Sequence, residues 1–414
     1  MNSRLLFALI GLTAVSLTLI FFQQEANGEA PSVPLPLNQW QRHVIDDGKP
    51  WRSVFITFAE INGDGRMDVV TGGWWYQQPA DLADPWTRHT IGSPLNNITA
   101  VYDFDNDGDQ DILGTNHIDE WTNFVADDVP FVWADNDGSG SFTIRNNIED
   151  GYGNFLQGVV VAPLQNGGDV QIALSWQNAD ASVGVQTLAV PTDIVADPWP
   201  WVQLSTSSQG EALSAGDIDK DGDLDLLLGT KWLRQDGASW STHTLFNSNK
   251  EVDRNRMVDM NGNGRLDAIV GYQAANVLGK LAWYEQGNSA TDLWSEHLIQ
   301  EIVGPMSLDV ADMDGDGDMD VIAGEHNTNQ PATAKLYIFE NKDGVGTSWQ
   351  AHIIYTGDEH HDGTQVVDID QDGDLDIISI GWSHSNVLLY ENLAIDLNLQ
   401  PAIWLPFIIT APKS

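Results

Sequence analysis

Short apolar runs alternate with polar turns along most of the chain, and this pattern predicts strands. Runs such as "VVTGG", "LLLGT" and "VIAGE" each end near a glycine, and aromatic segments such as "LAWYEQGN" and "LYIFENKDGVG" follow at a distance. Segments of this length, rich in β-branched and aromatic residues and bounded by Gly, Asn and Asp, are typical of β-strands. The chain is therefore expected to be all-β.

The strand pattern repeats in register. A motif Trp-x-x-His-x-Ile or a close variant starts at Trp40, Trp86, Trp240, Trp294 and Trp349, with weaker copies at Phe142 and Trp201. Each unit holds an apolar segment, an acidic loop, an apolar run, an aromatic segment and this motif. Seven units of about 50 residues, each with four strands, indicate a seven-bladed β-propeller with four-stranded antiparallel blades.

The phase of the repeat predicts how the ring closes. The chain starts with a motif strand, Trp40–Ile45, and its last repeat ends with an aromatic strand, Val387–Asn392. The first strand is expected to complete the last blade, because an open sheet edge promotes aggregation. The apolar segment Ala402–Ile409 is the alternative for that edge.

Acidic loops precede the apolar runs and have the chemistry of calcium sites. Asp312–Asp320 reads "DMDGDGDMD", and close copies occur at Asp103, Asp217 and Asp368. Oxygens at positions 1, 3, 5 and 9, with glycine at position 6 for the turn, suit Ca²⁺. An EF-hand is excluded, because position 12 is never Glu in these copies and strand-forming residues follow.

These loops and the turns "ADNDGSGSF" and "ENKDGVGTSW" resemble the FG-GAP/VCBS repeat proteins, which share the seven-bladed propeller of the integrin α-subunit head. The resemblance covers nearly all of Trp40–Asn392 and implies calcium in hairpin loops between the inner strands. About six structural calcium sites follow, while the eroded third unit, "APLQNGGDVQIALSW", should hold none. The implied ligands are Glu60, Asn62, Asp64 and Asp68; Asp103, Asp105, Asp107 and Asp111; Asp217, Asp219, Asp221 and Asp225; Asp259, Asn261, Asn263 and Asp267; Asp312, Asp314, Asp316 and Asp320; and Asp368, Asp370, Asp372 and Asp376.

Composition narrows the possible partners. Of the 414 residues, 60 are Asp or Glu and only 18 are Lys or Arg, for a net charge of −42. No basic patch is available to displace the counterions of a nucleic acid, so nucleic acid is not an expected partner. There is no cysteine, so disulfides and thiolate chemistry are excluded, and bound ions would take over the stabilising role of disulfides.

The first residues have the layout of a secretory signal peptide. Arg4 precedes an uncharged stretch, Leu5–Phe22, which polar and small residues follow. We expect a signal peptide over 1–28, a linker over 29–39, the propeller over 40–392 and a tail over 393–414. The protein should be secreted or at the cell surface, and monomeric. An uncleaved anchor is the alternative, and only then would it contact a membrane.

The ten histidines divide into two groups. His43, His89, His243, His297 and His352 belong to the outer-strand motif and are expected to pack there. The others fall at strand ends on the face opposite the acidic loops, where loops of several blades meet. The residues predicted to surround a ligand at the mouth of the channel are His117, His326, His360, His361, His384, Trp74, Trp382, Lys231 and Glu211, with Asp253 at a similar position.

Three functions compete at this point. A binding module for a glycan or an extracellular protein is favoured, because the resembling scaffold binds partners in integrin heads and sugars in some lectins. An enzyme is the second interpretation, since some sugar lyases and dehydratases carry this repeat and a histidine-rich mouth suits a general base. No nucleophile motif is present, and a fold alone implies no reaction. A purely structural or adhesive surface protein is the third.

Overall fold

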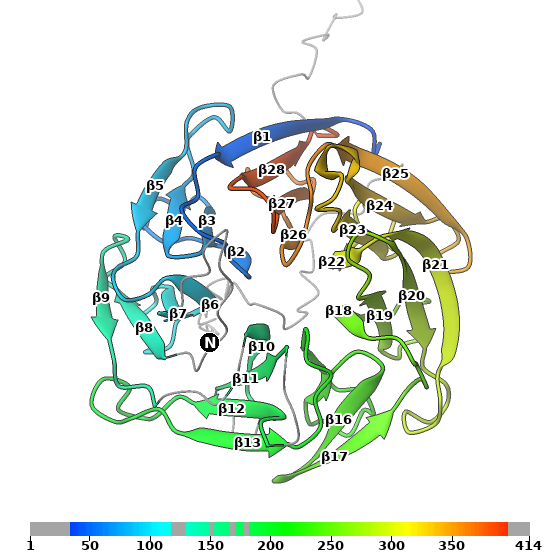
Figure 1. Cartoon of the computed structure of the whole chain (residues 1–414), viewed down its shortest axis with the longest axis horizontal. Coiled ribbons are helices and arrows are strands. Elements are labelled where there is room, and N and C mark those ends of the chain that lie inside the picture. Colours follow the sequence, from blue (N-terminus) through cyan, green and yellow to red (C-terminus); the bar gives the residue numbers. More distant parts are fainter. Residues whose placement is uncertain are drawn as a thin grey trace, which may run out of the picture.

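The structure is a computed structural model that describes residues 34–116, 130–149, 153, 155–164, 170–177 and 182–395. Its strands form seven four-stranded antiparallel sheets arranged as blades around a central channel (Figure 1). The predicted fold class, an all-β seven-bladed propeller, is confirmed. The expected signal peptide, residues 29–33 of the linker, most of the tail and His117 lie outside the described residues.

Each blade runs from an inner strand at the channel to an outer strand at the rim (Figure 1). The first three blades are β2 (Ile56–Ala59), β3 (Asp68–Thr71), β4 (Trp74–Gln77) and β5 (Thr87–Thr90); β6 (Asn97–Tyr102), β7 (Asp111–Thr115), β8 (Phe131–Asn136) and β9 (Phe142–Arg145); and β10 (Leu156–Ala162), β11 (Gln171–Trp176), β12 (Val185–Ala189) and β13 (Trp201–Ser205). The next three are β14 (Ser214–Gly216), β15 (Asp225–Leu227), β16 (Lys231–Asp236) and β17 (Ser239–Thr244); β18 (Val252–Val258), β19 (Asp267–Tyr272), β20 (Leu278–Glu285) and β21 (Ser295–Val303); and β22 (Pro305–Ala311), β23 (Asp320–Glu325), β24 (Lys335–Asn341) and β25 (Trp349–Thr356). Blade 7 is β26 (Thr364–Val367), β27 (Asp376–Ile380), β28 (Val387–Asn392) and β1 (Trp40–Asp46), and a short 3₁₀ turn, η1, covers Pro331–Thr333.

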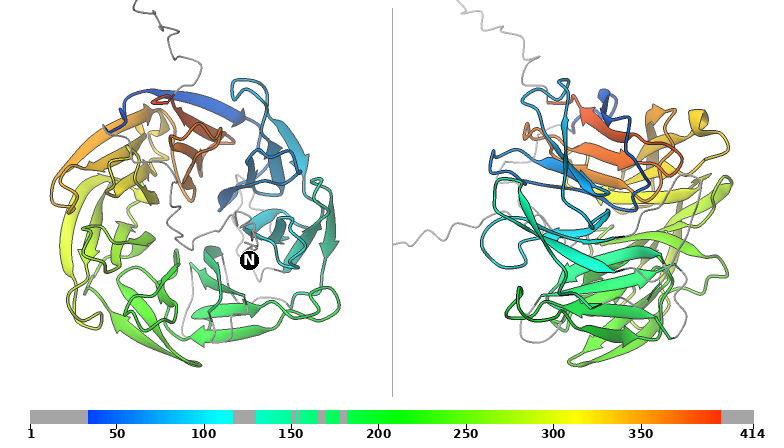
Figure 2. Two further views of the ribbon diagram at one scale, coloured as in Figure 1. Left: turned by 180° about the vertical axis from the view of Figure 1, so that it is seen from behind. Right: turned by 60° about the vertical axis from the view of Figure 1, so that its left-hand side comes forward.

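The first strand closes the ring, as its phase in the repeat predicted. β1 pairs antiparallel with β28, with Trp40 opposite Asn392 and Arg42 opposite Tyr390. Arg42 also forms an ion pair with Asp358 of the last blade, with Nε 2.5 Å from Oδ2. Seen from the front in Figure 1 and from behind in Figure 2, β1 (blue) lies along the rim of the last blade. The competing segment, Ala402–Ile409, lies outside the described residues.

The motif Trp-x-x-His-x-Ile fills a packing position on the outer strand. His89 stacks on Trp75 with ring centroids 4.1 Å apart, and His297 stacks on Trp283 at 4.3 Å. His243 stacks in the same way on its neighbour in the third strand. The expectation that the motif histidines pack is therefore confirmed for His89, His243 and His297.

A buried aspartate at the start of the second strand ties each acidic loop to its blade. In blade 6, Asp320 Oδ2 accepts the backbone N–H of Met313 at 3.1 Å, and Oδ1 accepts that of Asn341 at 2.9 Å. The same pair of bonds is made by Asp68, Asp111, Asp225, Asp267 and Asp376. Because these bonds satisfy backbone donors that would otherwise be buried alone, we call this residue the latch aspartate.

An amide side chain next to the latch links neighbouring blades. Asn136 of blade 2 donates from Nδ2 to the carbonyl of Ile61 in blade 1 at 2.9 Å. Gln78 of blade 1 makes the equivalent bond to Ile369 of blade 7 at 3.0 Å, so it also helps to close the ring. The junctions of blades 4 with 5 and 5 with 6 have it too, through Gln286 and Asn341. These bonds are called amide links below.

No helix in the part of the chain that the structure describes has the length and hydropathy that a membrane span requires.

Removal of the closing strand should cause aggregation. Deleting Trp40–Asp46 removes every partner of the outer side of β28, so an unpaired edge is exposed. We expect a large loss of monomer, measured by size-exclusion chromatography. Deleting Pro401–Ser414 leaves all seven sheets paired and should be milder, and the opposite ranking would contradict closure by β1.

Candidate functional site

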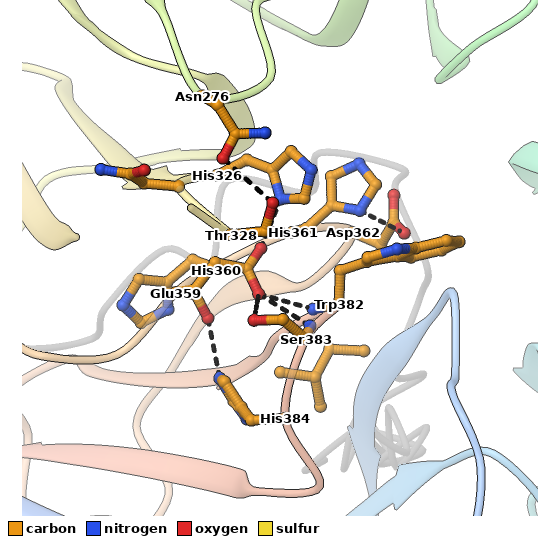
Figure 3. A network of polar contacts seen from close by, with 12 residues as sticks. Asn276, His326, Thr328, Glu359, His360, His361, Asp362, Trp382, Ser383 and His384 are labelled. Atoms are coloured by element: carbon orange, nitrogen blue, oxygen red, sulfur yellow. Dashed lines mark hydrogen bonds and ion pairs between the residues drawn. The ribbon is translucent and has the colours of Figure 1, made fainter. Parts of the chain in front are cut away.

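The predicted mouth residues lie on one face of the ring because of strand direction. In blade 6, β22 leads into the acidic loop at Asp312 and β23 leads away from it, ending at Glu325. His326 therefore follows at the end of the blade opposite the loop. The corresponding end of blade 7 carries His361 and Trp382, and Figure 3 shows these side chains gathered around one network of polar contacts.

A cavity of about 300 Å³ lies at this face. Residues from blades 3 to 7 line it: Phe155, Gln157, Gln177, Glu211, Asp253, Gln273, Ala275, Met306, His326, His361 and Trp382. Four of the predicted ligand residues are among them, namely Glu211, His326, His361 and Trp382. A smaller cavity of about 50 Å³ is lined mainly by inner-strand residues, Arg254 and Arg256 among them.

Irregularities in the inner strands supply three of the lining side chains. The pairing register shifts at Gln157 in β10, at Asp253 in β18 and at Met306 in β22. A β-bulge places an extra residue opposite its partner strand and changes the direction of its side chain. These shifts leave no clear mark in the sequence pattern, so sequence analysis did not identify Gln157 or Met306.

Glu359 fixes the orientation of His326. One carboxylate oxygen, Oε1, contacts Nδ1 of His326, and the other accepts the backbone N–H of Trp382 at 2.9 Å and two groups of Ser383 at 3.0 Å each (Figure 3). Burial opposes ionisation of Glu359, but these bonds hold its pKa below the usual value. With Nδ1 engaged, Nε2 is the nitrogen of His326 that remains for a ligand.

Four aromatic rings form one side of the cavity. His361 stacks on His326 with centroids 4.2 Å apart, and it meets Trp382 at 76° and 5.3 Å. Phe155 meets the same Trp382 at 86° and 6.0 Å. Burial lowers the pKa of His361 well below its usual value, with a contribution from the charge of His326. This wall is therefore weakly charged and largely apolar.

Two carboxyl groups share one arginine on another side of the cavity. Nη1 of Arg254 lies 3.6 Å from both Glu211 Oε2 and Asp253 Oδ1, too far for hydrogen bonds. Its other terminal nitrogen, Nη2, donates hydrogen bonds to Asp362 Oδ1 and, at 3.0 Å, to Gln157 Oε1. Burial raises the pKa of Asp253 to about 6 and that of Glu211 well above its usual value, although Arg254 opposes both shifts.

The other predicted ligand residues that the structure describes do not line this cavity. His360 is fully buried behind it, where Nδ1 contacts Ser379 Oγ at 2.8 Å and burial lowers its pKa to about 4. His384 contacts the backbone carbonyl of Glu359 at 2.8 Å (Figure 3). Trp74 is buried against Trp51 in the hydrophobic core, with ring centroids 4.4 Å apart. Lys231 begins β16, away from the residues that line the cavity.

Four acidic loops gather carboxylates as a calcium site would need. In each, three side chains place ligand oxygens within 4.8 Å of one another. The groups are Asp103, Asp105 and Asp111; Asp217, Asp219 and Asp225; Asp312, Asp314 and Asp316; and Asp368, Asp370 and Asp376. Burial and neighbouring carboxylates raise the pKa of Asp314 and Asp372 to about 6, as expected where a positive charge is missing. These residues fit a hard cation with oxygen ligands.

The other two loops already contain a cation of their own. Arg66 occupies position 7 of the loop that starts at Glu60, and its guanidinium lies 2.5 Å from Asp64. Arg265 has the same position in the loop that starts at Asp259 and donates to the carbonyl of Gln286 at 3.0 Å. The four loops that start at Asp103, Asp217, Asp312 and Asp368 have an aspartate at position 7. Among the described residues, the two loops with arginine at position 7 have no group of three converging carboxylates, and the four loops with aspartate there each have one.

Truncation of Glu359 should destabilise the fold. Glu359→Ala leaves His326 and two backbone N–H groups without partners in a buried site, so the free energy of unfolding should fall by about 3 kcal/mol or more. Glu285→Ala is the matched control, since its contact with His297 is exposed and should contribute about 1 kcal/mol or less. Urea unfolding measures both, and equal losses would show that Glu359 has no special role.

A known repeat family matches part of the chain. The FG-GAP-like repeat family matches residues 259–323, from the acidic loop of blade 5 to β23 of blade 6. No curated protein matches the chain by sequence. Among solved structures, the V. cholerae biofilm matrix protein Bap1 is 9% identical, with a TM-score of 0.43 over 92% of this chain and 91% of that chain. That level of similarity says nothing about activity. The resemblance inferred from the acidic loops is thus confirmed, and the chain is a seven-bladed β-propeller with an FG-GAP-like repeat.

Proposed function

We propose that this protein is a calcium-stabilised binding propeller that holds a glycan in the cavity at the mouth of its channel. The observation that supports this most directly is the lining of the cavity. It combines three glutamine amides, two carboxyl groups and two imidazoles with the rings of Phe155 and Trp382.

This lining matches the chemistry of a sugar. Sugar hydroxyls both donate and accept hydrogen bonds, and amide side chains offer both functions. Gln177 and Gln273 are partly exposed on the cavity side of blades 3 and 5. The C–H face of a sugar ring packs on apolar and aromatic surface, which Phe155, Trp382 and Met306 provide. A concave site with few polar groups among apolar ones is the usual form of a small-ligand site.

Calcium would stabilise the opposite face. The four clusters of carboxylates would hold the ions, each of which cancels two of the 42 net negative charges. Extracellular calcium modules bind with dissociation constants on the order of 10⁻⁴ to 10⁻³ M. At about 1 mM calcium, a site with a constant of about 0.1 mM would stabilise the native state by about 1.4 kcal/mol. Secretion or display on the cell surface would supply calcium at this level.

An enzyme that acts on the same ligand is the second candidate. The contact between Glu359 and His326 Nδ1 favours it, because this contact leaves Nε2 for a ligand at a cavity wall. A carboxylate that orients histidine in this way is common in general base catalysis. Formation of a product from a bound glycan would select this function over binding alone.

Calcium removal should lower the melting temperature, and its return should restore it. Titration should show about four ions, since two loops carry an arginine in place of an acidic residue. Asp105→Ala should reduce the number by one, whereas Asp64→Ala, in a loop with arginine, should leave it unchanged. An unchanged melt after chelation, or equal effects of the two variants on calcium number, would contradict the proposed sites.

Binding of oligosaccharides tests the cavity. A glycan array should identify at least one ligand, and Trp382→Ala should weaken its binding by about tenfold or more, because an aromatic wall is lost. Trp349→Ala, on the outer strand of blade 6, is the control and should bind normally. A ligand whose affinity is the same in both variants would place the site elsewhere, and an array without any ligand would overturn the glycan proposal.

A further inference from the structure

One carboxylate in the cavity has no partner. Asp253 is only 1% exposed, yet its Oδ1 makes no hydrogen bond with any residue that the structure describes. Asp253 is one of the residues that line the cavity. The nearest cation, Nη1 of Arg254, is 3.6 Å away and is itself without a hydrogen bond in the described structure. A buried polar group in this state is costly unless something else binds it.

Carboxyl groups outnumber arginines around the cavity, even when Arg52, which stacks on Trp382, is included. Arg254 faces three carboxyl groups, Glu211, Asp253 and Asp362, and its close contact is with Asp362. Glu251 adds further negative potential at Glu211. Glu359 contacts His326 and the backbone N–H groups of Trp382 and Ser383, so it does not compete for Arg254. Glu211 and Asp253 therefore share one guanidinium that is already engaged, and burial raises the pKa of both carboxyl groups although Arg254 opposes the shift.

The backbone of β18 brings Asp253 to this place. Register with β19 shifts between Val252 and Asn255, so that Asp253 and Arg254 both lie in the irregular segment. The strand would otherwise direct consecutive side chains to opposite faces. β-Bulges are common next to binding sites, where they change the direction of a functional side chain. The shift in β18 places Asp253 among the residues that line the cavity.

The aromatic wall also suits a cation. Arg52 already stacks on Trp382, with its guanidinium carbon 4.5 Å from the ring centroid. The electron-rich faces of tryptophan and phenylalanine attract cations, and carboxylates beside such rings are typical of sites for organic ammonium groups. An inorganic ion is less suited, because among the described residues no group of three acidic or histidine ligands converges at Asp253.

We propose that the glycan bound in this cavity carries a free amino group, and that its ammonium binds Asp253 with Glu211 beside it. The inference rests on the proposed glycan function and specifies the class of sugar. The ammonium donates to Asp253 Oδ1 and supplies the missing positive charge, while the ring of the amino sugar packs against Phe155 and Trp382.

Two sugars that differ only at the amine test this directly. The methyl glycosides of glucosamine and N-acetylglucosamine are titrated separately into the calcium-loaded protein at 150 mM salt, with binding followed by NMR. The wild type should bind the free amine at least about tenfold more tightly. Each probe has at most one charge, so general attraction to an acidic protein adds little to the difference.

Asp253→Asn should abolish the preference for the amine. It changes only one of the 42 net charges, so any preference that is due to overall charge would survive. Asp309→Asn is the matched control: Asp309 pairs with Arg256 at 2.8 Å on the inner strand of blade 6 and does not line the cavity. It should retain the full preference. If Asp253→Asn does not fold, Glu211→Gln should at least halve the preference.

The outcomes separate this inference from the glycan proposal. Equal binding of the two sugars, or a preference that Asp253→Asn retains, overturns the amino-sugar assignment and leaves glycan binding intact. If neither sugar binds but the array yields neutral glycans that require Trp382, the assignment is again overturned alone. If no sugar of any kind binds, both proposals fall.

Discussion

The latch aspartate is the interaction on which the propeller depends. It is buried at the point where an acidic loop turns into the second strand, and both of its oxygens accept backbone N–H groups, one from the loop and one from the third strand. Loop shape, strand register and the position of the neighbouring amide link all follow from it. Desolvation raises the pKa of Asp320 to about 8, and the two bonds from backbone N–H groups oppose this shift.

The fold could be predicted from sequence because it repeats. A strand pattern that recurs in register carries much more information than one strand, and the phase of the repeat predicted that Trp40 begins the strand that closes blade 7. The five histidines of the outer-strand motif could be distinguished from the other five for the same reason, because they recur at one position of the repeat. The structure adds that this position faces the aromatic ring of the third strand, as His89 does with Trp75.

The site was predictable only in part. His326, His361, Trp382 and Glu211 could be found because strand direction places the ends of neighbouring blades on one face. Phe155, Gln157 and Glu359 could not, because each acts through a local departure from the repeat. Phe155 has a positive φ of 62°, Gln157 lies where the register shifts, and Glu359 lies in a loop that has no counterpart pattern. A periodic pattern predicts the residues that the blades share, whereas the candidate site depends on residues that the blades do not share.

Blade 3 differs from its neighbours in how it is held. Among the described residues no amide link joins it to blade 2 or blade 4, and the Nε2 atom of Gln235, at the position of such a link, bonds Gly237 of its own turn instead. The polar contacts of blade 3 with blade 2 lie elsewhere: Ile148 pairs with Trp199 in a β-bridge, and Asn147 donates from Nδ2 to the carbonyl of Ile194 at 2.7 Å. Apolar clusters around Trp199 and Leu213 also pack at the two junctions. The blade that supplies Phe155 and Gln157 is thus fastened to blade 2 beside its outer strand, where the loss of a latch aspartate cannot release it.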